Sequence, residues 1–170
     1  YEVSIGFVMV SVLLCVGSLN LGDIIEAQRN MWFAIPLFPM FIVFFISTLA
    51  ETNRAPFDLP EGESELVAGF VTEYSGTRYA LFFLSEYANM FIVCAVSATA
   101  FFGGWQSPFP NFLNSPAWSV VWMLIKTLSL VFVMIWIRWT VPRLRVDQLM
   151  HMCWKGFIPI GLFNIFGVAV

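Results

Sequence analysis

The chain has 170 residues, of which 59% are hydrophobic and 11% are charged, and its formal net charge is −3. Soluble domains carry about 25% charged residues, so this composition excludes a soluble globular protein and indicates an integral membrane protein. The negative net charge gives no reason to expect nucleic-acid binding.

Five apolar segments are read as membrane-crossing helices, and the fifth is expected to continue beyond Val170. Separate spans must satisfy their own backbone hydrogen bonds in lipid, so helices are expected. The predicted fold is all-α, a polytopic transmembrane helix bundle in a single membrane domain covering residues 1–170. The expected spans are residues 3–22, 31–50, 79–104, 117–137 and 156–170, with inner-face loops at 51–78 and 138–155.

Both ends of the chain read as cut. The chain begins at Tyr1 without a basic leader or a small-residue cleavage site, so its first segment is not a signal peptide. The last apolar segment, 156–170, falls short of the roughly 20 residues that a span needs. We therefore expect a fragment of a longer protein.

The connection after the second span, 51–78, holds six of the eleven acidic residues: Glu51, Asp58, Glu61, Glu63, Glu65 and Glu73. Asp58 stands three residues before Glu61, a spacing that resembles a capping box and predicts a short helix. One alternative is a solvated acidic loop. Against it, apolar residues including Phe57 and Phe70 are too frequent for a loop in free water. We expect the loop to fold into the membrane mouth or to be covered by a partner.

The orientation follows from the distribution of lysine and arginine. One side has a single basic residue, Arg29. The connections on the other side hold Arg54, Arg78, Arg138, Arg143, Arg145 and Lys155. The acidic loop and the later basic loop, 138–155, are therefore expected to face the cytoplasm or matrix.

With this orientation, Glu2, Glu51 and Glu86 fall in the inner half of the membrane on three different helices. An ionised side chain at the bilayer centre costs at least ~2.5–3.5 kcal/mol, so such residues usually face a polar interior, pair, or carry protons. The simpler alternatives are that Glu51 is solvated at the edge of its span and that Glu86 reaches interfacial water. Lys126, near the middle of the fourth span, predicts an interior partner, with snorkelling as the alternative.

The cysteines do not form a redox or metal motif. Cys15, Cys94 and Cys153 are far apart and read as small buried side chains. His151 and Cys153 are close in sequence, but a metal site needs three or four ligands. The segment around them is expected to lie at headgroup depth, with Arg143, Arg145 and Trp154 in the interface.

Three long strings identify a resemblance. AETNRAPFDLPEGESELVAGFVTEY closely resembles a signature of the quinone-site membrane subunit of respiratory NADH:quinone oxidoreductase (complex I), called subunit 1 in mitochondria and the H subunit in bacteria. The resemblance continues through ALFFLSEYANM and WIRWTVPRLRVDQLMHMCWK and covers essentially the whole chain. Proteins of this family are nearly twice as long, which agrees with a fragment.

The resemblance implies a role in quinone reduction coupled to proton translocation, in a bacterial inner membrane or a mitochondrial inner membrane. Its substrate would be a quinone, either ubiquinone or menaquinone, and it would carry no flavin, iron–sulfur cluster or metal of its own. Its partners would be membrane lipid, quinone-site subunits of the hydrophilic arm and neighbouring small membrane subunits.

The family's acidic path maps onto Glu2, Glu51, Glu73 and Glu86, to which we add Lys126 as a candidate. The chamber and its gating loop map onto Arg54, Phe57, Asp58, Glu61, Glu63, Glu65 and Phe70. The inner-face basic loop contains Arg138, Arg143 and Arg145.

Two other functions use the same residues. A transporter or channel could move ions through its own Glu and Lys side chains, although no inverted repeat is evident. A homologous subunit of a membrane-bound hydrogenase or a related cofactor-oxidising complex would keep the ancestry and change the chemistry. The ETNRAPFDLPEGESELVAGF form favours the quinone enzyme.

Overall fold

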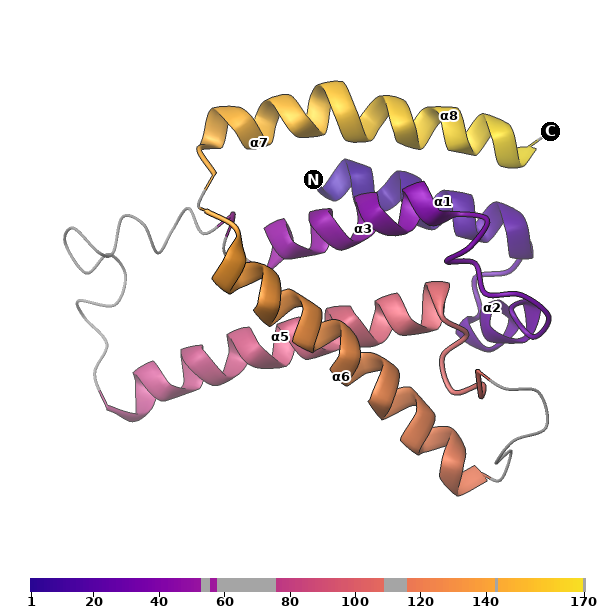
Figure 1. Cartoon of the computed structure of the whole chain (residues 1–170), viewed down its shortest axis with the longest axis horizontal. Coiled ribbons are helices and arrows are strands. Elements are labelled where there is room, and N and C mark those ends of the chain that lie inside the picture. The colour runs from indigo at the N-terminus through magenta and orange to yellow at the C-terminus, as the bar shows by residue number, and fades with distance from the viewer. Residues whose placement is uncertain (53–55, 58–75, 109–115, 143, 170) are drawn as a thin grey trace.

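A computed structural model describes residues 1–52, 56–57, 76–108, 116–142 and 144–169 of the chain (Figure 1). Within these ranges all regular structure is helical, which confirms the predicted all-α class. The elements are α1 (Glu2–Val16), α2 (Leu21–Ala27), α3 (Phe38–Glu51), α5 (Thr77–Phe101), α6 (Pro116–Thr140), α7 (Val146–Met152), the π-helical turn η2 (Cys153–Phe157) and α8 (Ile158–Ala169).

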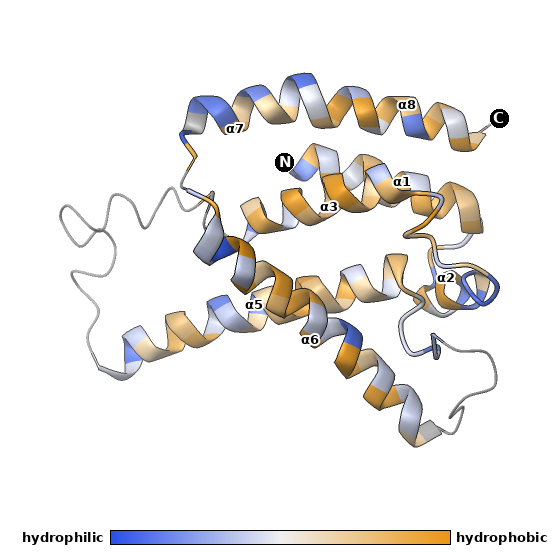
Figure 2. Ribbon diagram, viewed as in Figure 1, coloured by the Kyte–Doolittle hydropathy of each residue, from blue (hydrophilic) through white to orange (hydrophobic). Residues whose placement is uncertain are grey.

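The helices form a layered bundle. Helix α8 packs on α1 and α3, α5 packs on the other side of α3, and α6 crosses α5 (Figure 1). Apolar residues dominate most of the helices, as expected for segments that face lipid or one another (Figure 2). The chain is therefore a polytopic helical membrane protein.

Three helices are long and apolar enough to cross a membrane: Thr77–Phe101, Ala117–Thr140 and Asp147–Ala169. Helices α1 and α2 meet the same criterion only as a pair, which is bent by 65°. Helix α3 has 14 residues, fewer than the roughly 20 that a straight span needs. The expected segments 79–104 and 117–137 thus correspond to α5 and α6, whereas the other three differ from the expectation.

The first expected span, 3–22, is broken. Helix α1 ends at Gly17, which has a left-handed φ of 73° and donates its N–H to the Leu13 carbonyl at 2.7 Å. Helix α2 then begins after Asn20, whose side chain accepts a hydrogen bond from the Gly22 N–H at 3.1 Å. Gly17 ends one helix and Asn20 begins the next, so the segment is not one continuous helix although its composition is apolar throughout.

The second expected span, 31–50, is helical only from Phe38. Pro36 and Pro39 lack a backbone N–H, and proline is favoured in the first turn of a helix but not in its interior. Residues 31–37 therefore form irregular backbone, tied by a hydrogen bond of 2.9 Å from the Leu37 N–H to the Phe33 carbonyl.

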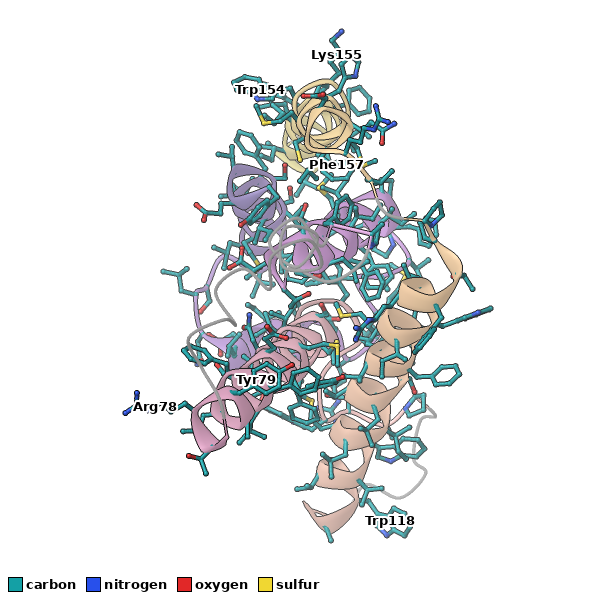
Figure 3. The ribbon with its side chains drawn as sticks, turned by 90° about the vertical axis from the view of Figure 1, so that its left-hand side faces the viewer. Arg78, Tyr79, Trp118, Trp154, Lys155 and Phe157 are labelled. Atoms are coloured by element: carbon teal, nitrogen blue, oxygen red, sulfur yellow. The ribbon has the colours of Figure 1, made fainter. Side chains whose placement is uncertain are left out.

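Of the expected loop at 138–155, residues 138–140 belong to α6, and from Val146 the chain is helical again and continues through η2 into α8. Gln148 starts this helix by accepting the Arg145 N–H at 3.2 Å. The segment is amphipathic: Cys153 and Phe157 are buried, whereas Trp154 and Lys155 point away from the bundle (Figure 3). Its charged face made it look like an interfacial loop.

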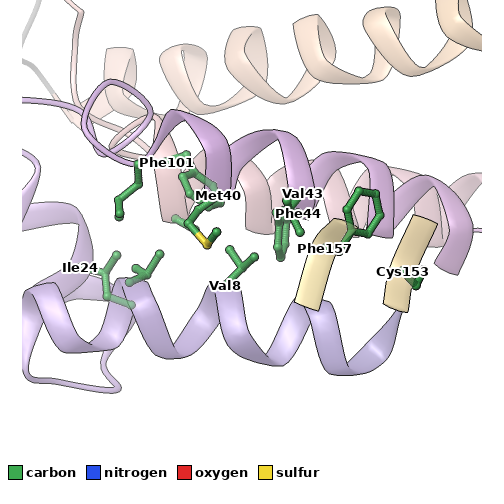
Figure 4. Close-up of a cluster of buried hydrophobic side chains, with 11 residues drawn as sticks. Val8, Ile24, Met40, Val43, Phe44, Phe101, Cys153 and Phe157 are labelled. Carbon is green, nitrogen blue, oxygen red and sulfur yellow. The ribbon is translucent and has the colours of Figure 1, made fainter. Parts of the chain in front are cut away.

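Two hydrophobic clusters hold the bundle together. The first joins inward side chains of α1, α3 and η2, including Val8, Met40, Phe44 and Phe157 (Figure 4). The second joins α3, α5 and α6 through Phe45, Met90, Cys94 and Met134, among others. Helix α3 contributes to both clusters and so fixes α1 relative to α5.

Candidate functional site

Two carboxylates from different helices line one groove of about 410 Å³. Glu2 begins α1, and Glu51 is the last residue of α3. The remaining wall is mostly apolar and comes from α1, α3 and α5: Ile5, Met9, Phe44, Thr48, Val93 and Val96. The groove therefore places two acidic groups against an apolar surface at the junction of three helices.

The antiparallel packing of α1 and α3 produces this arrangement. Because the start of one helix lies beside the end of the other, residues far apart in sequence meet at one end of the bundle. A carboxylate at a helix C-terminus faces the negative end of the helix dipole, which disfavours it by about 0.3–1 kcal/mol. Glu51 therefore does not stabilise α3 through the helix dipole.

The neighbouring Tyr1 phenol interacts electrostatically with both carboxylates. Burial raises the pKa of the Tyr1 side chain, and the negative charges of Glu51 and Glu2 raise it further. Thr48, the polar residue of the α3 wall, donates its hydroxyl proton to the Phe45 carbonyl at 2.8 Å. Its oxygen lone pairs remain able to accept a hydrogen bond from the groove.

Glu86 lies on the same α5 helix as two residues of the groove wall, but it is two turns before Val93 and is exposed. The structure thus brings Glu2 and Glu51 together and leaves Glu86 farther along α5. Seven predicted site residues of the acidic loop and one of the basic loop lie outside the described residues: Arg54, Asp58, Glu61, Glu63, Glu65, Phe70, Glu73 and Arg143.

The chain that follows α3 contacts the chain that precedes α7. The Leu144 N–H donates to the Pro56 carbonyl at 2.9 Å, and Phe57 is buried in the cluster between α3, α5 and α6. Arg145 is exposed at the start of α7. Arg138, in the last turn of α6, lines a small cavity of about 110 Å³ with Tyr87, Met90, Met134, Ile135 and Trp139.

Lys126 has interior partners, as its central position predicted. Its ammonium group donates to three backbone carbonyls, those of Phe102 at 2.7 Å, Gly104 at 3.0 Å and Gln106 at 2.6 Å. The same nitrogen lies 5.0 Å from the centre of the Trp32 ring. Lys126 is therefore not in the groove lined by Glu2 and Glu51.

Sequence reasoning missed Gln28. This side chain is fully buried and donates from Nε2 to the carbonyls of Ile24, Thr99 and Ala100 at 3.0–3.2 Å. Its Oε1 accepts the Gly103 N–H at 2.9 Å. An uncharged amide in a short connection gives little signal in sequence, although the nearby glycine pair 103–104 marks a tight turn.

Within the described residues, no group of three His, Cys, Asp or Glu side chains could hold a metal ion.

The model of the NADH dehydrogenase family matches residues 1–169. The chain belongs to the NADH dehydrogenase family. Similar proteins include the H subunit of NADH-quinone oxidoreductase from Rhodospirillum centenum, 58% identical over 166 residues that cover 95% of this chain and 48% of that protein. NADH-ubiquinone oxidoreductase chain 1 of Chondrus crispus is 55% identical over 169 residues, covering 99% of this chain and 52% of that protein.

The plant relative, NADH-ubiquinone oxidoreductase chain 1 of Arabidopsis thaliana, is 52% identical over 171 residues, covering 99% of this chain and 52% of that protein. The resemblance inferred from the sequence motifs is confirmed. The chain spans about half the length of the curated relatives it matches.

Proposed function

We propose that this chain is part of the membrane subunit of a proton-translocating NADH:quinone oxidoreductase, where it forms one side of the quinone chamber and the start of a carboxylate proton path. The observation that carries this proposal is the groove that Glu2 and Glu51 share between α1, α3 and α5. Family membership and relatives named as H subunits of NADH-quinone oxidoreductase support it.

The groove suits proton handling because it holds two carboxylates on a largely apolar wall. Two neighbouring acids interact, so a proton bound by one changes the energy of ionising the other. Reduction of a quinone to a quinol takes up two electrons and two protons. We propose that these protons, or the charge change that accompanies them, alter the protonation of Glu2 and Glu51, with Glu86 and Glu73 as further members of the series.

An aromatic face on α5 supports the quinone part of the proposal. The rings of Tyr79 and Phe83 are 6.1 Å apart, and those of Phe83 and Tyr87 are 5.1 Å apart. All three side chains are exposed on the half of α5 that precedes the groove. A row of rings at i, i+4 and i+8 offers an apolar surface of the kind that binds an isoprenoid tail.

The remaining parts of the proposal concern neighbours. Electrons would reach the quinone from an iron–sulfur cluster in a hydrophilic-arm subunit. The acidic loop, with Arg54, Phe57, Asp58, Glu61, Glu63, Glu65 and Phe70, would be the movable wall of the chamber. Arg138, Arg143 and Arg145 would lie at the inner face toward that arm. Small membrane subunits would continue the proton path from the groove.

The test is a Glu51→Gln variant of the full-length subunit in its assembled complex, reconstituted in vesicles. We expect quinone reduction by NADH to slow and the number of protons pumped per electron to fall. Glu26→Gln is the matched control, because Glu26 is an exposed glutamate on α2, outside the groove. Normal assembly together with an unchanged proton-to-electron ratio would refute the role of Glu51.

A further inference from the structure

The C-terminal end of α5 is irregular, yet its backbone carbonyls are almost fully accounted for. The Ala98 carbonyl accepts the N–H groups of Phe102 and Gly104, and the Phe101 carbonyl accepts that of Ala34. The carbonyls of Thr99 and Ala100 accept from Gln28, and that of Gly103 accepts the Gln106 N–H. Of the four that remain up to residue 106, those of Phe102, Gly104 and Gln106 accept from Lys126.

This irregular turn lies at membrane depth. Lys126 stands about 14 Å along the candidate span from Ala117, at 1.5 Å per residue, so its partners lie beside the interior of α6. Backbone outside regular helix is tolerated at that depth only where protein groups satisfy it. Lys126 supplies the donors that the turn 102–106 would otherwise lack.

The contacts match an ammonium ion in number. A protonated lysine has three N–H donors, and the structure gives each a carbonyl acceptor within 3.0 Å. Loss of a proton would leave two donors and turn a lone pair toward a carbonyl oxygen. Backbone carbonyls accept hydrogen bonds but do not take up protons, so none of these partners could relay one.

We propose that Lys126 is a fixed cation that clips the 102–106 turn to α6 and closes this end of the bundle, and that it is a positioning residue rather than a proton carrier. The face of the Trp32 ring stabilises the same charge, and Trp32 packs edge-on against Phe102 with ring centres 5.9 Å apart. Through Gln28 and Gln106, the turn is also tied to α2. The turn that follows α5 is thus held to α2 and α6 by side-chain hydrogen bonds.

The first experiment measures amide hydrogen exchange over residues 102–108 of the full-length subunit in its complex, by mass spectrometry. Lys126→Met is expected to speed exchange in this peptide and to lower the thermal midpoint of the complex. Lys155→Met is the matched control, because Lys155 is exposed and points away from the bundle (Figure 3). Unchanged exchange in the Lys126→Met variant would overturn the proposal. This measurement does not depend on quinone chemistry, so it stands apart from the proposed function.

The second experiment distinguishes a fixed cation from a proton carrier. Arginine keeps its charge and does not release a proton in proteins. Lys126→Arg is therefore expected to keep the parental number of protons pumped per electron in the complexes that assemble. Normal quinone reduction with lost pumping in this variant would overturn the proposal. Arginine is larger than lysine, and its complex could fail to assemble because the side chain does not fit among the three carbonyls. Such a failure, with normal assembly of Lys155→Met, supports the role of Lys126 in holding the 102–106 turn to α6. The ratio is then measured on assembled Lys126→Met complexes, where an unchanged value supports a fixed cation and a lost one overturns it.

Discussion

Glu2 and Glu51 line the same groove, although one begins α1 and the other ends α3. Tyr1, the N-cap of α1, makes no side-chain capping hydrogen bond, and Thr52, the C-cap of α3, donates its backbone N–H to the carbonyls of Ala50 and Thr48. The two carboxylates share the groove with residues of α5, which links them to the helix that carries Glu86.

If Glu2 and Glu51 act on the same protons, their substitutions should not be additive. Each single change to glutamine is expected to slow proton-coupled quinone reduction by about 10²-fold, the low end of the range for a positioned proton-transfer group. The double variant should lose little more than the worse single variant, because one site has already been broken. The measurement is the rate of NADH:quinone reduction coupled to proton uptake in vesicles, for all four combinations.

The control combines Glu51→Gln with Glu26→Gln, whose side chain is exposed on α2. These two changes should behave independently. Fully multiplicative losses in the Glu2 and Glu51 pair would show that the groove does not act as one site.

Gln28 is expected to be the most sensitive uncharged side chain of the bundle. Gln28→Leu leaves the Gly103 N–H and the carbonyls of Thr99 and Ala100 without this partner in a buried place. Each unsatisfied group costs about 1–3 kcal/mol, so the loss in unfolding free energy should reach several times that of one ordinary hydrogen bond. Gln28→Glu should be worse, because it turns a carboxylate oxygen toward those carbonyls.

Thermal unfolding of the purified full-length subunit in detergent checks this order. Gln106→Leu provides the intermediate case, since Gln106 makes one such bond, from Nε2 to the Ile25 carbonyl at 2.7 Å. A smaller effect of Gln28→Leu than of Gln106→Leu would contradict the hydrogen-bond account.

The long spans could be predicted from sequence because nothing interrupts them. The runs that became α5 and α6 contain no proline or glycine between residues 77 and 101 or between 117 and 140, so apolar length alone located them. The first two expected helices differ from the structure for local reasons. Gly17 and Asn20 divide the first into α1 and α2, and Pro36 and Pro39 place the start of the second at Phe38. Their apolar composition hid these signals.

The candidate site divides in the same way. That Glu2 and Glu51 lie at one end of the bundle follows from counting spans and turning the chain at each connection. The hydrogen bonds of Gln28 and Lys126 do not follow, because they depend on which carbonyls are left open where α5 ends. Such partners are set by tertiary packing and leave no periodic trace in the sequence.

Gly104→Ala tests the tight turn at residues 102–106, whose carbonyls accept hydrogen bonds from Lys126. Gly104 has a φ of 49°, and a Cβ there would come within 2.7 Å of the Ile25 Cδ1 atom. Left-handed backbone costs a residue with a Cβ roughly 1–2 kcal/mol, and crowding against the fully buried Ile25 should add to it. Gly17→Ala isolates the backbone term, because Gly17 has a φ of 73° and open space around it.

The crowding term can be removed separately. Ile25→Val deletes the Cδ1 atom, so the double variant Gly104→Ala with Ile25→Val should lose less unfolding free energy than the sum of the two single variants. Strict additivity of the thermal-unfolding data would show that the turn moves away from Ile25 instead.

Gly161 allows α8 to lie close to α1. A Cβ at this position would come within 3.1 Å of the Phe7 Cβ and 3.5 Å of its Cδ2, so the absence of a side chain sets the distance between the helices. Gly161→Leu is expected to cost about 1–3 kcal/mol through overpacking. Gly167→Leu, on the same helix with nothing within 4 Å, should cost little. Thermal unfolding of the purified subunit measures both, and Phe7→Ala should recover part of the Gly161→Leu loss by making room. If Gly161→Leu and Gly167→Leu proved equally harmful, the loss would come from changing a glycine in α8 and not from its contact with Phe7.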